Sequence, residues 1–371
     1  MDAIRDSTRR RGGDRLGRHG SEVASADLPE HSAEQALEIG AEGHTREALL
    51  ERRAALRRRR RNRRRRTVGL LVVAIGLVIV AAGGGRASHT SRGVTASRRQ
   101  SQTHSPAAAA QLPRGGRTIL PGHLVVAYYG IVGTSNILGH THNPETDAAG
   151  VQRQARAYAG YGRPVLPAFE LVATIASPNP GSHGTYSSPV DDATVSRYLQ
   201  AAHRQRLLLI LDFQPGRGEF LPEVRAYARF LKDPSVGVAL DPEWKLSGDQ
   251  VPDQAIGSSS AAAINAVSSY LSRLVALDRL PEKLFIIHEF RLSELPDRQH
   301  ITSRPGLATV LQMDGLGPVA VKLASYHQVM RGAGRFFPGF KLFLQRSADP
   351  VLLPPRRVMK LRSRPAYVSY Q

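Results

Sequence analysis

Residues 236–244, VGVALDPEW, place an unbroken apolar run directly before two acidic residues and a tryptophan. The run Val236–Leu240 contains no polar residue, which is typical of a strand that is covered on both faces. Asp241 and Glu243 therefore follow a buried strand at its carboxyl end. In a barrel of parallel strands, that end is the one that carries the chemistry.

Seven further apolar runs of this kind occur between residue 120 and residue 371, and helical patterns lie between most of them. The eight predicted strands are Leu124–Tyr129, Val165–Leu171, Leu207–Phe213, Val236–Leu240, Leu284–Phe290, Ala308–Met313, Lys341–Leu344 and Ala366–Tyr370. The predicted helices are Ala148–Tyr161, Asp191–Gln205, Leu221–Leu231, Ala261–Leu277 and Val319–Met330. Regular alternation of strands and helices implies parallel strands with right-handed crossovers.

Eight parallel strands in residues 120–371 predict an α/β fold, a closed (β/α)8 barrel of the TIM type. The sequence ends at Gln371, directly after the eighth strand, so we expect the last helix of the ideal barrel to be missing. An open, doubly wound sheet is the alternative. No G-x-G-x-x-G or G-x-x-x-x-G-K-[ST] loop follows the first strand, which argues against a nucleotide-binding version of that sheet.

Polar residues gather at the predicted carboxyl ends of the strands, whereas the opposite ends carry mostly proline, lysine and glycine. We take Asp212, Asp241 and Glu243 as candidate catalytic residues. The candidate substrate-binding residues are Tyr129, Glu170, Trp244, His288, Glu289, Asp314 and Tyr370. Each has a structural alternative, such as a turn cap for Asp212, a core position for His288, or an ion pair with arginine for Glu170.

Asp241 and Glu243 are the most informative pair. Residues i and i+2 of a strand point to the same side, with Cα atoms about 6.5 Å apart. Two carboxylates that face one cleft repel each other, which raises the pKa of one of them. A protonated carboxyl beside an ionised one is what glycoside hydrolysis requires.

The sequence excludes several other chemistries. It contains no cysteine, so it has no disulfide, thiolate metal site or cysteine nucleophile. No G-x-S-x-G motif is present, which argues against a serine hydrolase. His140-Thr141-His142 has the spacing of a metal motif, but it lies in a predicted loop, about ten residues past the first strand. We therefore expect neither a metal nor a cofactor.

An uninterrupted apolar segment at residues 67–85 divides the chain. It carries no charge and spans about 28 Å as a helix, enough for the core of a bilayer. Nine of the ten residues from Arg57 to Arg66 are arginine, which predicts a cytoplasmic N-terminus and an outer C-terminal part. The n-region is too long for an ordinary signal peptide, so we expect an uncleaved, single-pass anchor in the cell membrane.

The charge distribution supports this organisation. Residues 1–116 hold 23 arginines and 11 acidic residues, a balance of +12 in a chain whose net charge is +20. A charged membrane flank explains the excess without a nucleic-acid partner, and we expect none. The predicted parts are a disordered cytoplasmic tail at 1–66, the membrane helix at 67–85, a linker at 86–119 and the barrel at 120–371.

Five motifs in the outer domain carry a resemblance to a known family. They are Tyr128-Tyr129-Gly130, Leu211-Asp212, Leu240-Asp241-Pro242-Glu243-Trp244, Gly339-Phe340-Lys341-Leu342-Phe343 and Tyr367-Val368-Ser369-Tyr370. With them, residues 120–371 resemble an uncharacterised family of exported actinobacterial proteins that has a glycoside-hydrolase-like barrel and a D-P-E-W motif. The resemblance implies the barrel fold and export, but no assigned activity.

A looser similarity is to chitinase-type glycosidases, whose fourth strand ends in D-x-x-D-x-D-x-E. Only the final D-x-E is present here, as Asp241 and Glu243, and the two upstream aspartates of the motif are absent. The similarity implies that Glu243 protonates the leaving oxygen and that Asp241 orients an N-acetyl group of the substrate. Tyr129, Trp244 and Tyr370 correspond loosely to the aromatic residues that hold sugar rings in that family.

These observations give one functional hypothesis and one alternative. The hypothesis is a membrane-anchored, extracytoplasmic barrel, resembling glycoside hydrolases, whose partner is a cell-envelope polysaccharide. The alternative is a barrel without catalytic activity that binds a glycan or a partner protein at the cell surface. The mildly basic outer domain suits an anionic cell wall in both cases.

Overall fold

The computed structural model describes residues 109–134, 136–181 and 183–371. Its strands are β1 (Leu124–Gly130), β2 (Val165–Ala176), β3 (Ser187–Pro189), β4 (Leu208–Phe213), β5 (Val236–Leu240), β6 (Lys283–His288), β7 (Leu307–Met313), β8 (Phe337–Leu342) and β9 (Tyr367–Tyr370). Its α-helices are α2 (Pro144–Arg156), α3 (Asp192–Gln205), α4 (Phe220–Ala226), α5 (Ala228–Leu231), α6 (Ala261–Leu277), α7 (Val319–Met330) and α8 (Pro355–Val358). The short 3₁₀ helices are η1 (Pro242–Trp244), η2 (Leu292–Glu294) and η3 (Arg298–His300).

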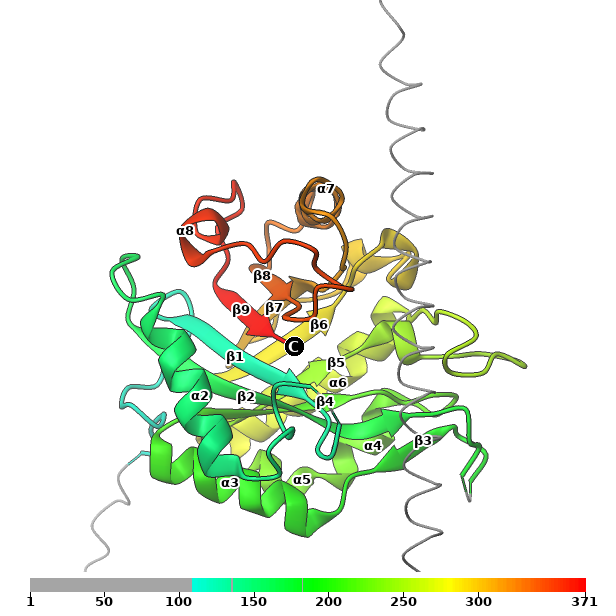
Figure 1. The fold of residues 1–371 in the computed structure, drawn as a ribbon. Coiled ribbons are helices and arrows are strands. Elements are labelled where there is room, and N and C mark those ends of the chain that lie inside the picture. The colour runs from blue at the N-terminus through cyan, green and yellow to red at the C-terminus, as the bar shows by residue number, and fades with distance from the viewer. Residues whose placement is uncertain (1–108, 135, 182) are drawn as a thin grey trace, which may run out of the picture. The chain divides into compact units, whose positions relative to one another are not determined.

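Eight parallel strands form a closed barrel. Their order is β1-β9-β8-β7-β6-β5-β4-β2, and β1 also pairs with β2, so the ring has no free edge. Figure 1 shows the helices outside the strands, with α7 and α8 on the side away from α3 and α5. The predicted TIM-type barrel is confirmed, and the open doubly wound sheet is ruled out by the β1–β2 pairing.

Two separate apolar clusters explain why the strands lack a polar face. One lies inside the barrel and takes alternate residues from each strand, such as Val125 and Ala127 from β1. The other lies between the strands and the helices and takes the residues in between, such as Val126 and Tyr128. Because each strand is covered on both sides, its sequence is a continuous apolar run.

The amino end of the barrel is closed by the segment before β1. Leu112, Ile119 and Leu120 are buried in the inner cluster. The backbone amides of Ile119 and Leu120 donate to Oε2 of Glu282, at 2.5 and 3.0 Å. The linker predicted for 86–119 was therefore placed too far along the chain, because residues 112–119 belong to the base of the barrel.

Three further elements differ from the sequence prediction. The helix predicted at 221–231 is divided into α4 and α5, and β3, which pairs antiparallel with β2, was not expected. The predicted strand 341–344 begins earlier, at Phe337, and includes Pro338 and Gly339. These residue types argue against a strand. Gly339 is nevertheless required, because a Cβ there would lie 2.8 Å from Cγ1 of Val310 and 3.0 Å from Cα of Gln312.

No helix in residues 109–134, 136–181 or 183–371 is long and apolar enough to cross a membrane. The tail predicted at 1–66, the membrane helix predicted at 67–85 and the linker up to residue 108 lie outside the described residues. Those three predictions therefore stay predictions.

Substituting Gly339 by valine should destabilise the barrel, because the added methyl groups would overlap β7. We expect a loss of about 1–3 kcal/mol in the free energy of unfolding. Gly334→Val is the matched control, since a Cβ at Gly334 meets no atom within 4 Å. Urea unfolding followed by the fluorescence of Trp244, the single tryptophan, measures both. Equal stability of the two variants would contradict the packing argument.

Candidate functional site

Each of the eight barrel strands contributes one buried, inward-facing polar side chain toward its carboxyl end, and for β5 this is Asp241, directly after the strand. These residues, here called the polar ring, are Tyr129, Glu170, Asp212, Asp241, His288, Gln312, Lys341 and Ser369. Each lies two residues beyond an inward position of its own strand, such as Ala127 before Tyr129 or Ala239 before Asp241. Because side chains of a strand alternate, the ring points into the barrel at its carboxyl end.

His288 crosses the ring and joins two carboxylates. Its Nε2 lies 2.9 Å from Oε1 of Glu170, and its Nδ1 lies 3.1 Å from Oδ2 of Asp314. The hydroxyl of Tyr367 donates to the other oxygen of Glu170 at 2.7 Å. Burial acts to lower the pKa of His288, but the hydrogen bonds to Asp314 and Glu170 outweigh it and hold this pKa well above its usual value. His288 is therefore a buried cation that donates through both nitrogens.

Lys341 is the second cation of the ring and is 1% exposed. Its Nζ lies 3.4 Å from the ring centroid of Tyr129 and 3.7 Å from Oδ2 of Asp314. The side-chain amide of Gln214 donates to the hydroxyl of Tyr129 at 3.2 Å and to Oδ2 of Asp241 at 3.4 Å. These contacts join Tyr129, Lys341 and Asp241 into one network, while Gln312 donates to the hydroxyl of Ser369 at 2.6 Å.

Asp241, Glu243 and Asp314 converge at this end of the barrel, with one carboxylate oxygen from each within 4.8 Å of the others. The sequence suggested that Asp241 and Glu243 meet because residues i and i+2 of one strand point to the same side, but the structure brings them together in another way. Glu243 does not continue the strand, because η1 begins at Pro242 and turns the chain back. The amide of Gly257 donates to the carbonyl of Glu243 at 2.6 Å and so fixes this turn.

Burial dominates the protonation of the acids. It raises the pKa of Asp241 well above the usual value, and the nearby charge of Glu243 raises it further. Burial also raises the pKa of Asp212 to about 7, against the opposing effects of His288 and Lys341. At neutral pH the site therefore retains protons on carboxyl groups that would be ionised in water.

A hard divalent cation takes oxygen ligands with spacings of this kind, so Asp241, Glu243 and Asp314 could hold one. Shared protons satisfy the same oxygens, and clustered acids do not by themselves indicate an ion. Within the described part of the chain this is the one group of three or more side chains with such spacing. His140 and His142 do not belong to it, and both are exposed.

Three predicted binding residues lie away from the centre of the ring. Glu289 is buried and forms an ion pair with Arg298 at 2.6 Å. Tyr370 faces the helices, because its neighbour Ser369 faces inward, and the hydroxyls of Tyr370 and Tyr158 are 2.6 Å apart. Trp244 is half-buried on η1. Tyr370 therefore packs against the helix layer, and its expected contact with a sugar stays a prediction.

The sequence also concealed several members of the site. Lys341 and Gln312 are long polar residues inside largely apolar strands, and their position two residues after an inward one was the available signal. Glu294 had no such signal, since it belongs to the short helix η2. Burial, together with the charges of Glu243 and Asp314, raises the pKa of Glu294 well above its usual value.

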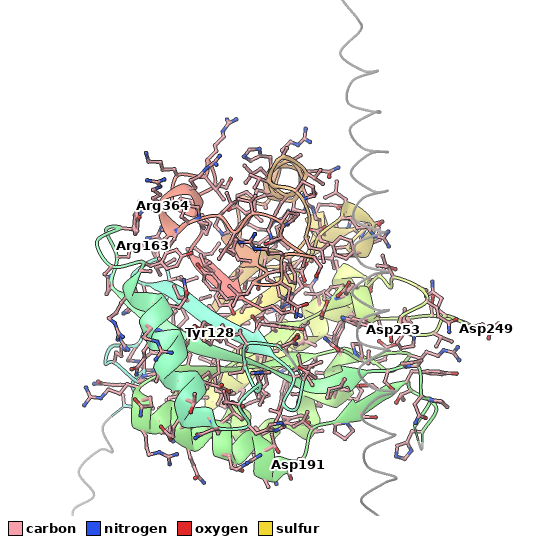
Figure 2. All side chains as sticks on the ribbon, viewed as in Figure 1. Tyr128, Arg163, Asp191, Asp249, Asp253 and Arg364 are labelled. Carbon is pink, nitrogen blue, oxygen red and sulfur yellow. The ribbon has the colours of Figure 1, made fainter. Side chains whose placement is uncertain are left out.

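Two hollows of the described domain bear on binding. The first, of about 350 Å³, lies at the carboxyl ends of β1, β8 and β9. Its lining includes Tyr128, which Figure 2 shows on β1 beside α2, together with Asn136, Arg153, Gln345 and Gln371. The second, of about 420 Å³, lies at the opposite end of the barrel. Neither is lined by Asp241 or Glu243, which are 2% and 5% exposed.

Comparison with known proteins adds no identification. No protein-family model matches the sequence, and no curated protein matches it. The argument for function therefore depends on the polar ring and its surroundings. Its strongest elements are the paired carboxyls Asp241 and Glu243 and the buried cations His288 and Lys341.

Asp212 should make the stability of the barrel depend on pH. Its pKa of about 7 in the folded state exceeds the usual 3.8, so the folded protein binds the extra proton between these values. Stability should therefore fall as the pH rises from 4 to 7, by up to about 4 kcal/mol. Asp212→Asn mimics the protonated form and should flatten this decline.

Urea unfolding between pH 4 and pH 8 measures the effect as the difference between the parent and Asp212→Asn. Asp249→Asn changes an exposed aspartate and serves as the control, which should follow the parent. A curve for Asp212→Asn that runs parallel to the parent at all pH values would show that Asp212 does not carry this proton.

Proposed function

We propose that this protein is a glycoside hydrolase that acts on cell-envelope polysaccharide. The observation that supports the proposal is the set of buried carboxyls at the carboxyl end of a TIM-type barrel. Asp241, Glu243 and Asp314 present oxygens within 4.8 Å of one another, and burial raises the pKa of Asp241 well above its usual value. Cleavage of a glycosidic bond requires a general acid, and a carboxyl that retains a proton at neutral pH can serve as one.

In the proposed reaction, Glu243 protonates the leaving oxygen, and Asp241 assists Glu243 as its partner in sharing one proton. Asp241 is deeper than Glu243, and Gln214 donates to its Oδ2. The pair holds one proton, which Glu243 delivers as the bond to the leaving sugar breaks. Asp241 is then left ionised beside the positive charge that develops on the substrate, and this placement stabilises that charge.

The close spacing favours retention at the anomeric carbon. Inverting enzymes keep their carboxyls about 6.5–9.5 Å apart so that a water molecule fits between them. The oxygens of Asp241, Glu243 and Asp314 lie within 4.8 Å, which is too short for that arrangement. The nucleophile in this proposal is the N-acetyl group of the substrate itself, which Asp241 orients.

The hollow of about 350 Å³ is the proposed binding place for sugar units next to the ring. Its volume lies within the range of small-molecule sites, about 300–1,000 Å³. Gln371, which lines it, is 7% exposed, and its side-chain oxygen has no hydrogen-bond partner among the residues that the structure describes. Amide and guanidinium groups around an aromatic residue suit the hydroxyls of a polysaccharide.

The proposal includes a location, which follows from the sequence. Residues 67–85 would anchor the chain in the cell membrane as a single span, with the arginine-rich tail in the cytoplasm and the barrel outside. That placement gives the barrel access to a polysaccharide of the envelope.

A second candidate is a barrel that binds a glycan or a partner protein without cleaving it. The observation that favours this alternative is the burial of the acids. Asp241 and Glu243 are 2% and 5% exposed, and neither lines the two hollows. The two carboxyls are therefore poorly accessible to a substrate in this conformation.

Glu243→Gln should abolish hydrolysis while the barrel stays folded. Loss of a general acid lowers the rate by about 10²–10⁴-fold. The full-length chain is incubated with envelope polysaccharide or with N-acetylhexosamine oligomers, and new reducing ends are counted. Asp249→Asn, on the exposed loop after β5, is the control and should keep full activity (Figure 2).

Three outcomes of this experiment separate the candidates. Release that disappears in Glu243→Gln and persists in a chelator supports the acid mechanism. If the chelator abolishes release, hydrolysis depends on a bound metal ion and the acid mechanism is contradicted. Binding of the oligomers with no release by the parent would leave the binding barrel as the function.

Oligomers of glucose should resist cleavage, because they lack the N-acetyl group that acts as the nucleophile. The product of N-acetylhexosamine oligomers should keep the anomeric configuration of the substrate, as measured by proton NMR in the first minutes. Inversion, or equal rates on both types of oligomer, would contradict the proposed participation of the N-acetyl group.

A further inference from the structure

Three arginines line the hollow of about 420 Å³ at the amino end of the barrel. They are Arg114 in the base segment, Arg156 in the last turn of α2 and Arg163 just before β2. No acidic residue is among the residues that line the hollow. The site lies at the end of the barrel opposite to the polar ring and plays no part in the proposed hydrolysis.

The charges of this hollow are not neutralised by the described part of the protein. Neither Arg156 nor Arg163 forms an ion pair or a hydrogen bond with any residue that the structure describes. Arg114 donates only to backbone carbonyls, those of Arg206 at 3.2 Å and Val165 at 3.3 Å. Arg114 and Arg156 are exposed and Arg163 is half-buried. Guanidinium groups that line one hollow without a counter-ion favour the binding of an anion.

More arginines border the hollow and add to its positive potential. Burial and the nearby charge of Arg206 lower the pKa of Arg114, and burial and the charge of Arg364 lower that of Arg163. Arg364 donates to the carbonyl of Tyr161 and so stays close to this turn. Figure 2 shows Arg163 and Arg364 at the same edge of the domain.

The carboxyl end of α2 explains part of this pattern but not all of it. Arginine in a last helical turn interacts favourably with the free carbonyls, which accounts for Arg156. Arg163 and Arg114 lie outside the helix and gain nothing from its dipole. A purely structural role would also pair such side chains with carboxylates, as Arg204 pairs with Glu145 on the neighbouring helix.

We propose that this hollow is a binding site for a phosphate group. Three guanidinium groups match the charge and the hydrogen-bonding oxygens of a phosphate. The phosphate belongs either to a soluble ion or to the headgroup of an anionic phospholipid. The lipid is included because the described chain begins close to this end of the barrel, where Leu112 is buried in the inner cluster.

The first test uses inorganic phosphate and the full-length chain in an uncharged detergent. Calorimetric titration should show one saturable site in the parent. Arg156→Gln and Arg163→Gln should each weaken binding about tenfold. Arg163→Lys, which keeps the charge but not the planar fork, should recover part of the affinity. Arg346→Gln removes an exposed arginine far from the hollow in sequence and should bind like the parent.

The second test identifies the source of the phosphate. The full-length chain is placed in bilayer discs of phosphatidylcholine, with or without phosphatidylglycerol, and treated with phenylglyoxal, which modifies free arginines. Mass spectrometry then reports the modification of Arg156, Arg163 and Arg346. Protection of Arg156 and Arg163 by phosphatidylglycerol alone indicates a lipid headgroup, and protection only by added phosphate indicates the soluble ion.

Two results would overturn the proposal. One is that neither phosphate nor phosphatidylglycerol binds or protects in a manner that depends on Arg156 and Arg163. The other is that Arg346→Gln weakens phosphate binding as much as Arg163→Gln does, because that would reflect net charge and not a site. Both results are independent of Glu243, so failure here leaves the proposed hydrolysis unaffected.

Discussion

The polar ring depends on electrostatic compensation inside a closed barrel. Three of its eight members are carboxyls, and a fourth carboxyl, Asp314, lies beside the ring; all four are at most 7% exposed. Only His288 and Lys341 oppose them within the ring. Isolated charges are too costly to bury, so such acids must pair, hydrogen-bond or keep protons. His288 pairs with Glu170 and Asp314. The raised pKa values of Asp212 and Asp241 reflect carboxyls that keep their protons.

The barrel separates this polar level from an apolar one. Below the ring the interior is filled by residues such as Ala168, Ile210 and Ile286, and the base is closed by Leu112 and Ile119. Burial of apolar surface is the main favourable term in folding, so the apolar layers offset the free-energy cost of burying the polar ring. The two ends of the barrel consequently differ, with acids at the carboxyl ends of the strands and uncompensated arginines at the amino ends.

Much of the fold was predictable because its signals are local. Continuous apolar runs identified all eight barrel strands, and α6 and α7 have the predicted bounds, Ala261–Leu277 and Val319–Met330. The errors occurred where tertiary packing overrides residue preference. Gly339 belongs to β8 because the crowded interior leaves no space for a Cβ, and that crowding involves β7, far away in the sequence.

The sequence by itself determined which residues end each strand, and so brought Asp212, Asp241, His288 and Asp314 to one end of the barrel. It did not determine which way each side chain points or what it meets. Only the tertiary structure turned Glu243 back on η1, directed Tyr370 into the helix layer, and brought Lys341 over the ring of Tyr129. The physical reason is that alternation along one strand is a local property, whereas contacts between strands are set by closure of the whole barrel.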